Sequence, residues 1–206
     1  MGEPRHKTIE PKILYFGTPV LLVSVLQEDG SPNLSPISSA WALGWTIVLG
    51  FEVTAKGKAN LERTGECVLN APSPDLWQNV ERLAPLTGNN PPPAHKADKF
   101  QYCANKFAAA GLTTAPSECV APPRVTECPL QLEAKLEATH VLANRDGRYP
   151  VGIVAVEVRV VRVHVHEDLI IKDHYINPAR WSPLIYNFRH YFGLGPELGK
   201  TFRAEA

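Results

Sequence analysis

The sequence predicts a mainly β protein, an antiparallel barrel of about six strands with short helices added. Stretches with the apolar patterns of strands recur along the chain, notably at residues 20–26, 130–138 and 151–166. No regular alternation of strands with helices separates them, which argues against the repeating units of a parallel sheet. With 206 residues, the chain suits a single domain over residues 1–206.

The first predicted elements form a hairpin. Residues 20–26 are apolar almost throughout, as in a strand buried on both faces, and Asp29-Gly30 marks a turn. The return strand lies in EDGSPNLSPISSAW, residues 28–41. A third strand, WTIVLGFEV at residues 45–53, follows, and Gly50 within it predicts a bulge or a close approach of another segment.

Two short helices and a strand are predicted next. Residues 58–64 suit a short helix ended by Gly65, and residues 66–70 suit a strand. Ser73 is a predicted helix cap, with Pro74 at the first helical position. The second helix has three apolar residues on one face: Leu76, Val80 and Leu83.

Residues 87–123 are predicted to be an insertion between strands. They contain TGNNPPPAH, a predicted helix at residues 99–110 ended by Gly111, and a loop rich in proline, serine and threonine. Insertions of this length often form a wall or lid of a ligand site.

Two long strands complete the predicted barrel. Apolar and polar residues alternate over residues 130–138, so the period of two favours a strand over a helix. In VGIVAVEVRVVRVHVH, residues 151–166, the valines change face between Val160 and Val161. That change predicts a bulge or a change of packing partner at this point.

Composition excludes several classes of partner. Lysine plus arginine and aspartate plus glutamate number 21 each, so the net charge is zero and neither nucleic acid nor a membrane surface is an expected partner. No apolar run approaches the roughly 20 residues of a membrane span, and the first residues lack a signal-peptide pattern, so we expect a cytoplasmic protein. The cysteines lack metal-site spacing and are predicted to be reduced structural thiols, namely Cys67, Cys103, Cys119 and Cys128.

The return strand is the first candidate site. Pro32 and Pro36 have no N–H, so they remove ladder hydrogen bonds and confine the strand to an edge or an interrupted position. Ser38 and Ser39 could then offer amides and hydroxyls to a phosphate or to the edge of a heterocycle. The alternative is an exposed edge that the prolines protect from pairing with another chain.

The start of the first helix is the second candidate. Lys56 and Lys58 stand in VTAKGKAN, where the free amides of a helix start favour an anion. The alternative is a solvated basic turn. The glycines do not fit a nucleoside-triphosphate loop.

Other chemistry is weakly supported. His164 and His166 share one face of a strand, but no third metal ligand is evident, and no metal site is predicted. No nucleophile motif and no acid–base pair stand out, so no catalytic side chain is predicted. The aromatic C-terminal extension, residues 174–206, is expected to pack on the core or a second subunit, or to form the wall of a pocket for an aromatic ligand.

These stretches, in this order, resemble the flavin reductase-like family of FMN-binding split barrels. The resemblance rests on KILYFGTPVLLVSVLQEDGSPNLSPISSAW, ANLERTGECVLN, SPDLW, KFAAAGL, VAPPRVTECPLQLEA and HYINPARWSPLIYNFR, across about residues 10–195. It implies a six-stranded antiparallel split β-barrel that dimerises and binds FMN between its subunits. It also implies reduction of the FMN by NAD(P)H.

The resemblance further implies which residues bind FMN. They are Ser35, Pro36, Ile37, Ser38 and Ser39 for the ring and ribityl chain, Thr54, Lys58 and Asn60 around the phosphate, and Trp181 to help close the site. We therefore expect an NAD(P)H-dependent flavin reductase, with hydride passing directly to the flavin. Its electron acceptor would be a small molecule or a partner oxygenase. The alternatives are an FMN- or haem-binding module without efficient turnover and a pyridoxamine-phosphate oxidase-like protein.

Overall fold

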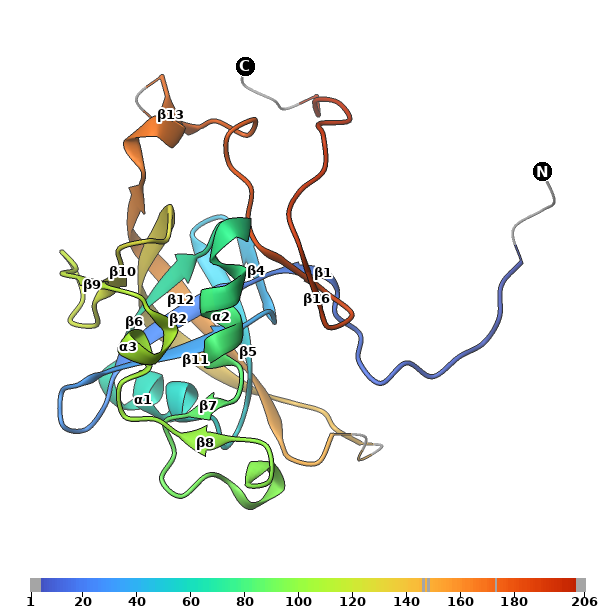
Figure 1. The fold of residues 1–206 in the computed structure, drawn as a ribbon, viewed down its shortest axis with the longest axis vertical. Coiled ribbons are helices and arrows are strands. Elements are labelled where there is room, and N and C mark those ends of the chain that lie inside the picture. Colours follow the sequence, from blue (N-terminus) through green and yellow to red (C-terminus); the bar gives the residue numbers. More distant parts are fainter. Residues whose placement is uncertain (1–4, 146, 148, 173, 203–206) are drawn as a thin grey trace.

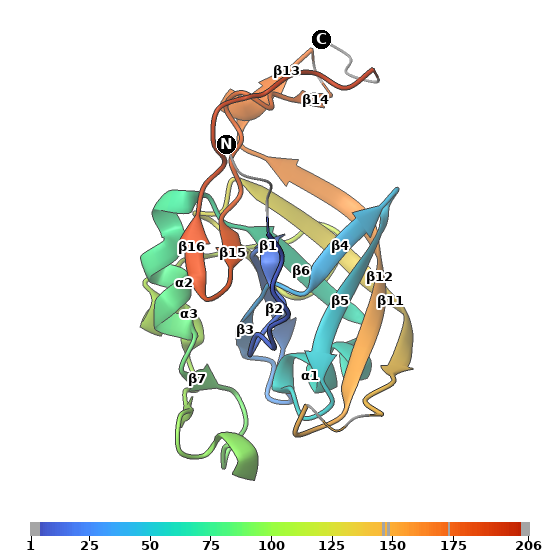
Figure 2. The ribbon, with the colours of Figure 1, turned by 90° about the vertical axis from the view of Figure 1, so that its right-hand side faces the viewer.

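The chain folds around one curved antiparallel sheet. The computed structural model describes residues 5–145, 147, 149–172 and 174–202. The sheet is an open barrel with helices and the C-terminal segment beside it (Figures 1 and 2). Across the sheet the strands are β3 (Pro32–Ile37), β2 (Leu21–Leu26), β6 (Glu66–Ala71), β11 (Leu130–Leu142), β12 (Ile153–Val165), β5 (Thr46–Glu52) and β4 (Ala40–Leu43). The prediction of a mainly β antiparallel barrel is confirmed.

The return strand of the first hairpin ends earlier than predicted. Residues 28–41 were expected to form one strand, but β3 ends at Ile37 and β4 begins at Ala40. The main sheet therefore has seven strands, one more than the predicted six. Its two edges, β3 and β4, are consecutive in the chain, with only Ser38 and Ser39 between them.

Strand β2 is buried on both faces, as its continuous apolar run predicts. Val23 and Val25 face the barrel interior, whereas Leu22 belongs to a second apolar cluster outside the barrel. Burying one such side chain stabilises a fold by about 1.5–3 kcal/mol. The second cluster joins the sheet to α2 (Trp77–Leu83), α3 (Lys106–Ala110) and the C-terminal tail through Leu22, Leu34, Val80, Leu83, Phe107 and Leu184.

The predicted change of face in the long valine strand is a β-bulge. On β11, Glu133 lies opposite Arg162 and Ala134 lies opposite Val160, so Val161 has no partner in the register. The extra residue moves the following valines to the other face of the sheet. The prediction at Val160 and Val161 is confirmed.

The helices largely match the predictions. Helix α1 (Lys56–Thr64) starts two residues before its predicted start and ends at Gly65, whose φ of 73° is left-handed. The 3-10 helix η1 (Pro74–Leu76) leads into α2 (Trp77–Leu83). The predicted capping role of the Ser73 side chain is wrong, because that side chain makes no cap hydrogen bond.

The predicted helix at residues 99–110 is wrong in its first half. Residues 101 and 102 form a strand, and α3 covers only Lys106–Ala110 before the left-handed Gly111. The side chain of Asn105 accepts a hydrogen bond from the Ala108 amide at 3.0 Å. This N-cap starts the helix later than the apolar pattern alone indicates.

The remaining elements are short. The elements within and directly beside the insertion, residues 87–123, are β7 (Leu86–Thr87), η2 (Ala94–Lys96), β8 (Gln101–Tyr102), α3, β9 (Thr114–Ala115) and β10 (Arg124–Val125). The C-terminal part contains η3 (Glu167–Leu169), β13 (Ile170–Ile171), β14 (Tyr175–Ile176), β15 (Ile185–Asn187) and β16 (His190–Phe192). Strand β1 (Phe16–Pro19) pairs with β15, which brings the two ends of the domain together beside α2 (Figure 2).

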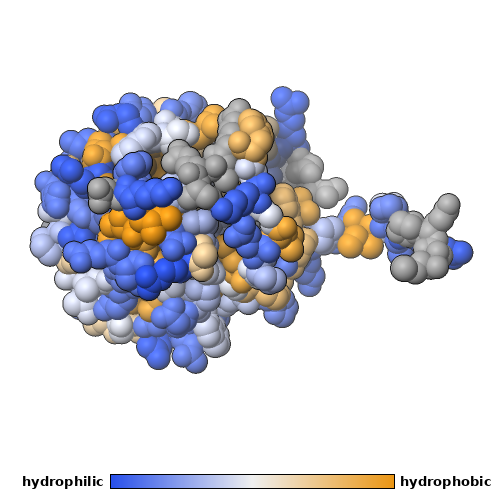
Figure 3. Space-filling model, turned by 90° about the horizontal axis from the view of Figure 1, so that it is seen from above, coloured by the Kyte–Doolittle hydropathy of each residue, from blue (hydrophilic) through white to orange (hydrophobic). Residues whose placement is uncertain are grey.

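The surface and the cysteines add two observations. No helix within the described residues is long and apolar enough to span a membrane. Apolar side chains gather in patches among hydrophilic ones, and the N-terminal segment projects from the body (Figure 3).

All four cysteines are free, as predicted, and burial raises the pKa of the Cys67 thiol to about 12.

Candidate functional site

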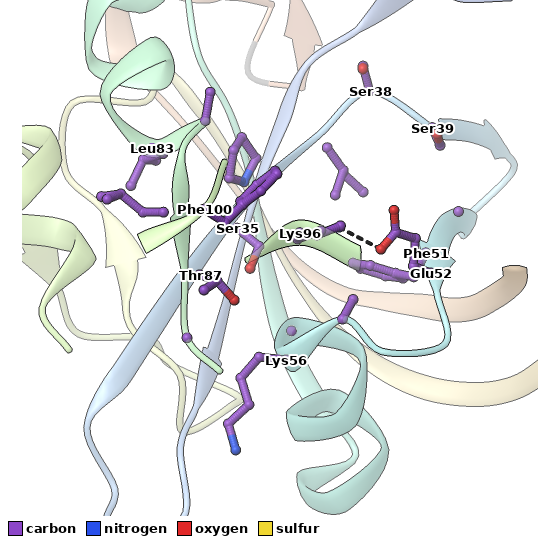
Figure 4. A pocket seen from close by; sticks show the side chains of 18 of the residues that line it. Ser35, Ser38, Ser39, Phe51, Glu52, Lys56, Leu83, Thr87, Lys96 and Phe100 are labelled. Carbon is purple, nitrogen blue, oxygen red and sulfur yellow. Dashed lines mark ion pairs between the residues drawn. The ribbon is translucent and has the colours of Figure 1, made fainter. Parts of the chain in front are cut away.

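A cavity of about 430 Å³ lies beside the junction of β3 and β4. Side chains from the sheet, the start of α1 and the insertion reach it (Figure 4). Side chains of the C-terminal tail also line it. This volume is within the range of about 300–1,000 Å³ that is typical of small-molecule sites. Segments that are far apart in the sequence thus meet at one place.

The β3–β4 junction forms one wall of this cavity. All five predicted residues line it: Ser35, Pro36, Ile37, Ser38 and Ser39. Strand β3 pairs with β2 along its whole length, so the strand is well paired on one side. Its other edge has no neighbouring strand in the sheet, which confirms the predicted edge position.

Gly50 and Tyr15 hold the junction in place. The Gly50 amide donates to the Ser39 carbonyl at 2.6 Å, and the hydroxyls of Tyr15 and Ser39 are 2.6 Å apart. A Cβ atom on Gly50 would lie 2.7 Å from the Cβ of Ser39, a distance that real side chains do not tolerate. The close approach predicted at Gly50 is confirmed.

The first turn of α1 forms a second wall, through Thr54, Ala55, Lys56 and Gly57. No side chain caps this helix, and its first turn has no acidic residue. The free amides and the helix dipole therefore favour an anion here. The Lys56 ammonium itself binds Glu28 at 2.7 Å, so the stem of Lys56, not its charge, lies at the cavity.

Three predicted site residues lie elsewhere. Lys58 pairs with Glu62 at 2.8 Å and is absent from the cavity lining. Asn60 is buried outside the lining, and neither of its side-chain polar atoms has a hydrogen-bond partner among the described residues. Trp181 packs against the barrel core and borders a different, smaller hollow. Their contact with a ligand stays a prediction.

Sequence reasoning missed Lys106, the first residue of α3. Lys106 lines the cavity and is only 3% exposed. Burial lowers the pKa of its ammonium to about 8, against a smaller opposing effect of Cys103. No hydrogen bond or ion pair of that ammonium is found among the described residues. A buried cation beside a cavity favours an anionic or electron-rich ligand. The Asn105 cap was the sequence signal that could have located it.

The insertion is tied to the cavity rim through Glu52. The Glu52 carboxylate lies 2.5 Å from the Lys96 ammonium (Figure 4). It also lies 3.3 Å from the ring of His95, and both residues belong to η2. It also accepts a hydrogen bond from the Tyr149 hydroxyl at 3.2 Å. Burial and the Glu52 charge raise the pKa of Tyr149 to about 12. The insertion therefore forms part of the wall, as its length suggested.

Replacing Glu52 with glutamine is expected to lower the pKa of Tyr149 from about 12 toward its ordinary value of 10 and to loosen η2. Glutamine has no charge to hold Lys96 or to oppose the phenolate. An ultraviolet titration referenced to Tyr149→Phe measures the first effect, and limited proteolysis within residues 89–100 measures the second. An unchanged pKa would mean that burial alone sets it.

Aromatic residues of the tail complete the cavity. Tyr186 and Tyr191 line it, and both also pack against the second apolar cluster. The expected packing of the aromatic tail on the core is confirmed for these two residues. They also line the cavity, and its use by an aromatic ligand stays a prediction. Burial raises the pKa of both phenols, so these rings are neutral and apolar in character.

The histidine pair has a structural explanation. His164 lies 2.7 Å from Oε1 of Glu133, and that carboxylate also accepts the amides of Glu118 and Cys119 at 2.8 and 2.5 Å. In the described part of the chain, no three His, Cys, Asp or Glu side chains are grouped as metal ligands would be. Glu133 and His164 thus anchor the end of the insertion to the barrel.

Comparison with known proteins yields one family. A family model described as "Flavin reductase like domain" matches residues 13–195. The uncharacterized protein YdfE of Bacillus subtilis (strain 168) is 50% identical over 202 residues, which cover 98% of this chain and 95% of that protein.

Solved structures share the fold. Flavoredoxin of Desulfovibrio vulgaris (Miyazaki F) superposes with a TM-score of 0.77 at 22% identity, covering 97% of this chain and 99% of that one. Nitrilotriacetate monooxygenase component B from Bacillus cereus superposes with a TM-score of 0.76 at 22% identity, covering 96% and 100%. A protein from Shewanella frigidimarina NCIMB 400, described as a "putative flavin reductase with split barrel domain", superposes with a TM-score of 0.73 at 20% identity, covering 91% of this chain and 87% of that one. The shared fold is therefore a split barrel.

Proposed function

Because this chain belongs to the flavin reductase-like family, we propose that it binds FMN and transfers a hydride from NAD(P)H to the flavin. The observation that carries the proposal is the convergence of three kinds of donor on one cavity. These are the edge segment at residues 35–39, the uncapped start of α1 and the buried ammonium of Lys106.

These donors fit FMN, which has a phosphate at one end and a polar heterocycle at the other. The amides of Lys56 and Gly57, with the Thr54 hydroxyl nearby, would hold the phosphate. The amides and hydroxyls of residues 35–39 would bind the polar edge of the ring. A Cβ on Gly57 would lie 3.0 Å from Ser35 Oγ, so glycine keeps the space between these two walls open.

Lys106 would stabilise negative charge on the ring system when the flavin is reduced. The bound flavin would itself accept the hydride, which accounts for the missing acid–base pair in the sequence. The chain's own residues would bind the cofactor, orient it and exclude water. A small-molecule acceptor or a partner oxygenase would then take the electrons.

The proposal is tested with purified apoprotein. FMN is titrated while flavin absorbance and melting temperature are followed, and oxidation of NADH and NADPH is then measured with and without FMN. We expect a bound flavin, a raised melting temperature and FMN-dependent oxidation. Bound flavin that neither nucleotide reduces would favour a binding module without turnover, and no FMN binding would reject the proposal.

We further propose that the protein is a homodimer that uses the free edge of β4. Trp41, Leu43 and Trp45 at this edge are 60%, 75% and 63% exposed. An edge strand with exposed apolar side chains pairs readily with another chain. Leu43→Glu is therefore expected to give monomers in sedimentation experiments, whereas Leu198→Glu, at a fully exposed tail residue, is the control. A monomeric wild-type protein would contradict this expectation.

A further inference from the structure

Four aromatic side chains form a series from the cavity to the protein surface, and we refer to them as the aromatic relay. Tyr15 directly precedes β1, Tyr186 lies on β15 and Tyr191 lies on β16; these three strands form one small sheet. Trp77 begins α2, which lies beside β16 (Figure 2). Segments that are far apart in the sequence therefore bring the four rings together.

Each ring of the aromatic relay lies next to the following one. The ring centroids of Tyr15 and Tyr186 are 5.5 Å apart, and the rings meet edge to face. The centroids of Tyr186 and Tyr191 are 5.7 Å apart, and those of Tyr191 and Trp77 are 6.2 Å apart. These separations are typical of attractive aromatic pairs. Because electron transfer weakens steeply with distance, three short steps between neighbouring rings are much faster than one long step.

The two ends of the aromatic relay lie in different surroundings. Its three tyrosines line the cavity, and the hydroxyls of Tyr15 and Ser39 are 2.6 Å apart in the cavity wall. Trp77 does not belong to this lining and is 44% exposed. The aromatic relay therefore links the proposed flavin site to solvent.

Tyr191 has a proton acceptor already in place. Its hydroxyl donates a hydrogen bond to Oε2 of Glu81 at 3.0 Å. Burial and this hydrogen bond raise the pKa of the Tyr191 phenol, so the ring is neutral before any oxidation. A phenol that loses an electron becomes a strong acid, and the Glu81 carboxylate can take its proton without rearrangement of the fold. Tyr191 is therefore suited to lose and regain an electron and a proton together.

Packing alone explains only part of this arrangement. Tyr186 and Tyr191 pack against the second apolar cluster, but Trp77 belongs to neither apolar cluster. Phenylalanine or leucine would fill the same space in a core. All four rings are instead tyrosine or tryptophan, the ring types that lose one electron most readily. The choice of side chains therefore favours a redox role.

We propose that the aromatic relay carries oxidising equivalents away from the cavity, with a light-excited flavin as the one-electron oxidant. Tyr15 gives this oxidant one electron, and each following ring replaces the electron lost by the ring before it. At Tyr191 the O–H bond breaks, the proton passes to Glu81, and it returns when Trp77 supplies an electron. The net change is one electron from Trp77 to the flavin and one proton from the indole N–H to water. A thiol in solution then restores the indole by giving up its S–H hydrogen.

This inference rests on the proposed function, because the flavin supplies the oxidant. Light-excited flavins oxidise the side chains beside them, and such damage would fall on the residues that bind the cofactor. Transfer to Trp77 moves the oxidation to a place that reductants in solution reach. The activity is thus protective and separate from hydride transfer.

Pulse radiolysis of the apoprotein tests the aromatic relay without any flavin. Azide radicals oxidise tryptophan side chains, and the absorptions of tryptophan and tyrosine radicals are followed in time. We expect a fast phase, independent of protein concentration, in which a tyrosine radical grows as a tryptophan radical decays. Trp77→Phe and Tyr191→Phe, which each keep a ring in place, should abolish this phase. Trp41→Phe, at a 60% exposed tryptophan outside the aromatic relay, should retain it.

Two results of this experiment would overturn the inference. One is a fast phase that survives in Trp77→Phe, and the other is a wild-type protein that lacks the phase.

Flash excitation of the FMN-loaded protein tests the proposed direction. The wild type is expected to form a tryptophan radical that Trp77→Phe and Tyr191→Phe lack. Mass spectrometry after steady illumination should locate oxidation at Trp77 in the wild type and at Tyr15 or Tyr186 in Tyr191→Phe. FMN that binds and is reduced by NAD(P)H, without a radical that depends on Trp77, would reject the aromatic relay alone. Without FMN binding, the proposed function and the flavin as oxidant both fail, even if radiolysis shows transfer between the rings.

Discussion

Replacing Lys106 with methionine is expected to stabilise the apoprotein and to weaken FMN binding at least tenfold. Lys106 as a residue is 3% exposed, and no hydrogen bond or ion pair of its ammonium is found among the described residues, so burial opposes its charge. Methionine has a similar length without that charge. Lys106 nevertheless lines the cavity, so the variant loses a positive charge that would attract an electron-rich ligand. Denaturant titration and FMN titration measure the two effects.

The pKa shift of Lys106 also predicts how the free energy of unfolding depends on pH. The pKa of Lys106 is about 8 in the fold and 10.5 in the unfolded chain, so between these values the unfolded state binds more protons. Wild-type stability should therefore rise with pH in this window, by up to roughly 3 kcal/mol. The advantage of Lys106→Met is largest below pH 8 and disappears near pH 10.5. Lys135→Met, at a half-exposed lysine, is the control. Unchanged FMN affinity would contradict a role at the cavity.

Replacing Glu133 with alanine is expected to destabilise the protein by about 3–5 kcal/mol, the usual cost of removing one member of a buried interaction that involves a charged group. The carboxylate is fully buried and accepts three hydrogen bonds, from two backbone amides and His164. Alanine would leave all three donors unpaired. Glu137→Ala, which breaks an exposed pair with Arg159, is expected to change the free energy of unfolding by less than about 1 kcal/mol.

Acid should mimic the loss of the Glu133 charge. Burial alone would raise the pKa of this carboxyl, but the hydrogen bonds from Glu118, Cys119 and His164 together lower it by more. The pKa in the fold therefore lies below 4.5. The stabilisation is therefore complete above pH 4.5 and is lost as the pH falls through the lower, folded-state pKa. Urea denaturation of wild type and Glu133→Ala from pH 7 downward measures it. A difference between the two proteins that does not shrink in acid would contradict this account.

Local patterns predicted most of the barrel. The bulge at Val161, the left-handed end of α1 at Gly65 and the strand at residues 130–138 all follow from side-chain periodicity or from one residue's backbone preference. The break at Ser38 and Ser39 could not be placed this way. It depends on the turn from one sheet edge to the other, which is a property of the whole barrel.

The site was predicted where its residues are contiguous and missed where they are not. Residues 35–39 line the cavity because one edge segment carries all of them. Lys106 reaches the same cavity from a distant element, and its burial depends on packing that no short window reveals. Lys58 was favoured for its charge near a helix start, yet its position on the helix directs it to Glu62.

The connection of β3 to β4 has a mechanical consequence. These strands are the first and last of the sheet, so the seam of the barrel is bridged by covalent chain at Ser38 and Ser39, whereas a fully closed barrel seals its seam with hydrogen bonds. A ligand bound at this bridge would contact both edge strands, β3 and β4, at once. Such a ligand would oppose the separation of either edge strand from the rest of the barrel.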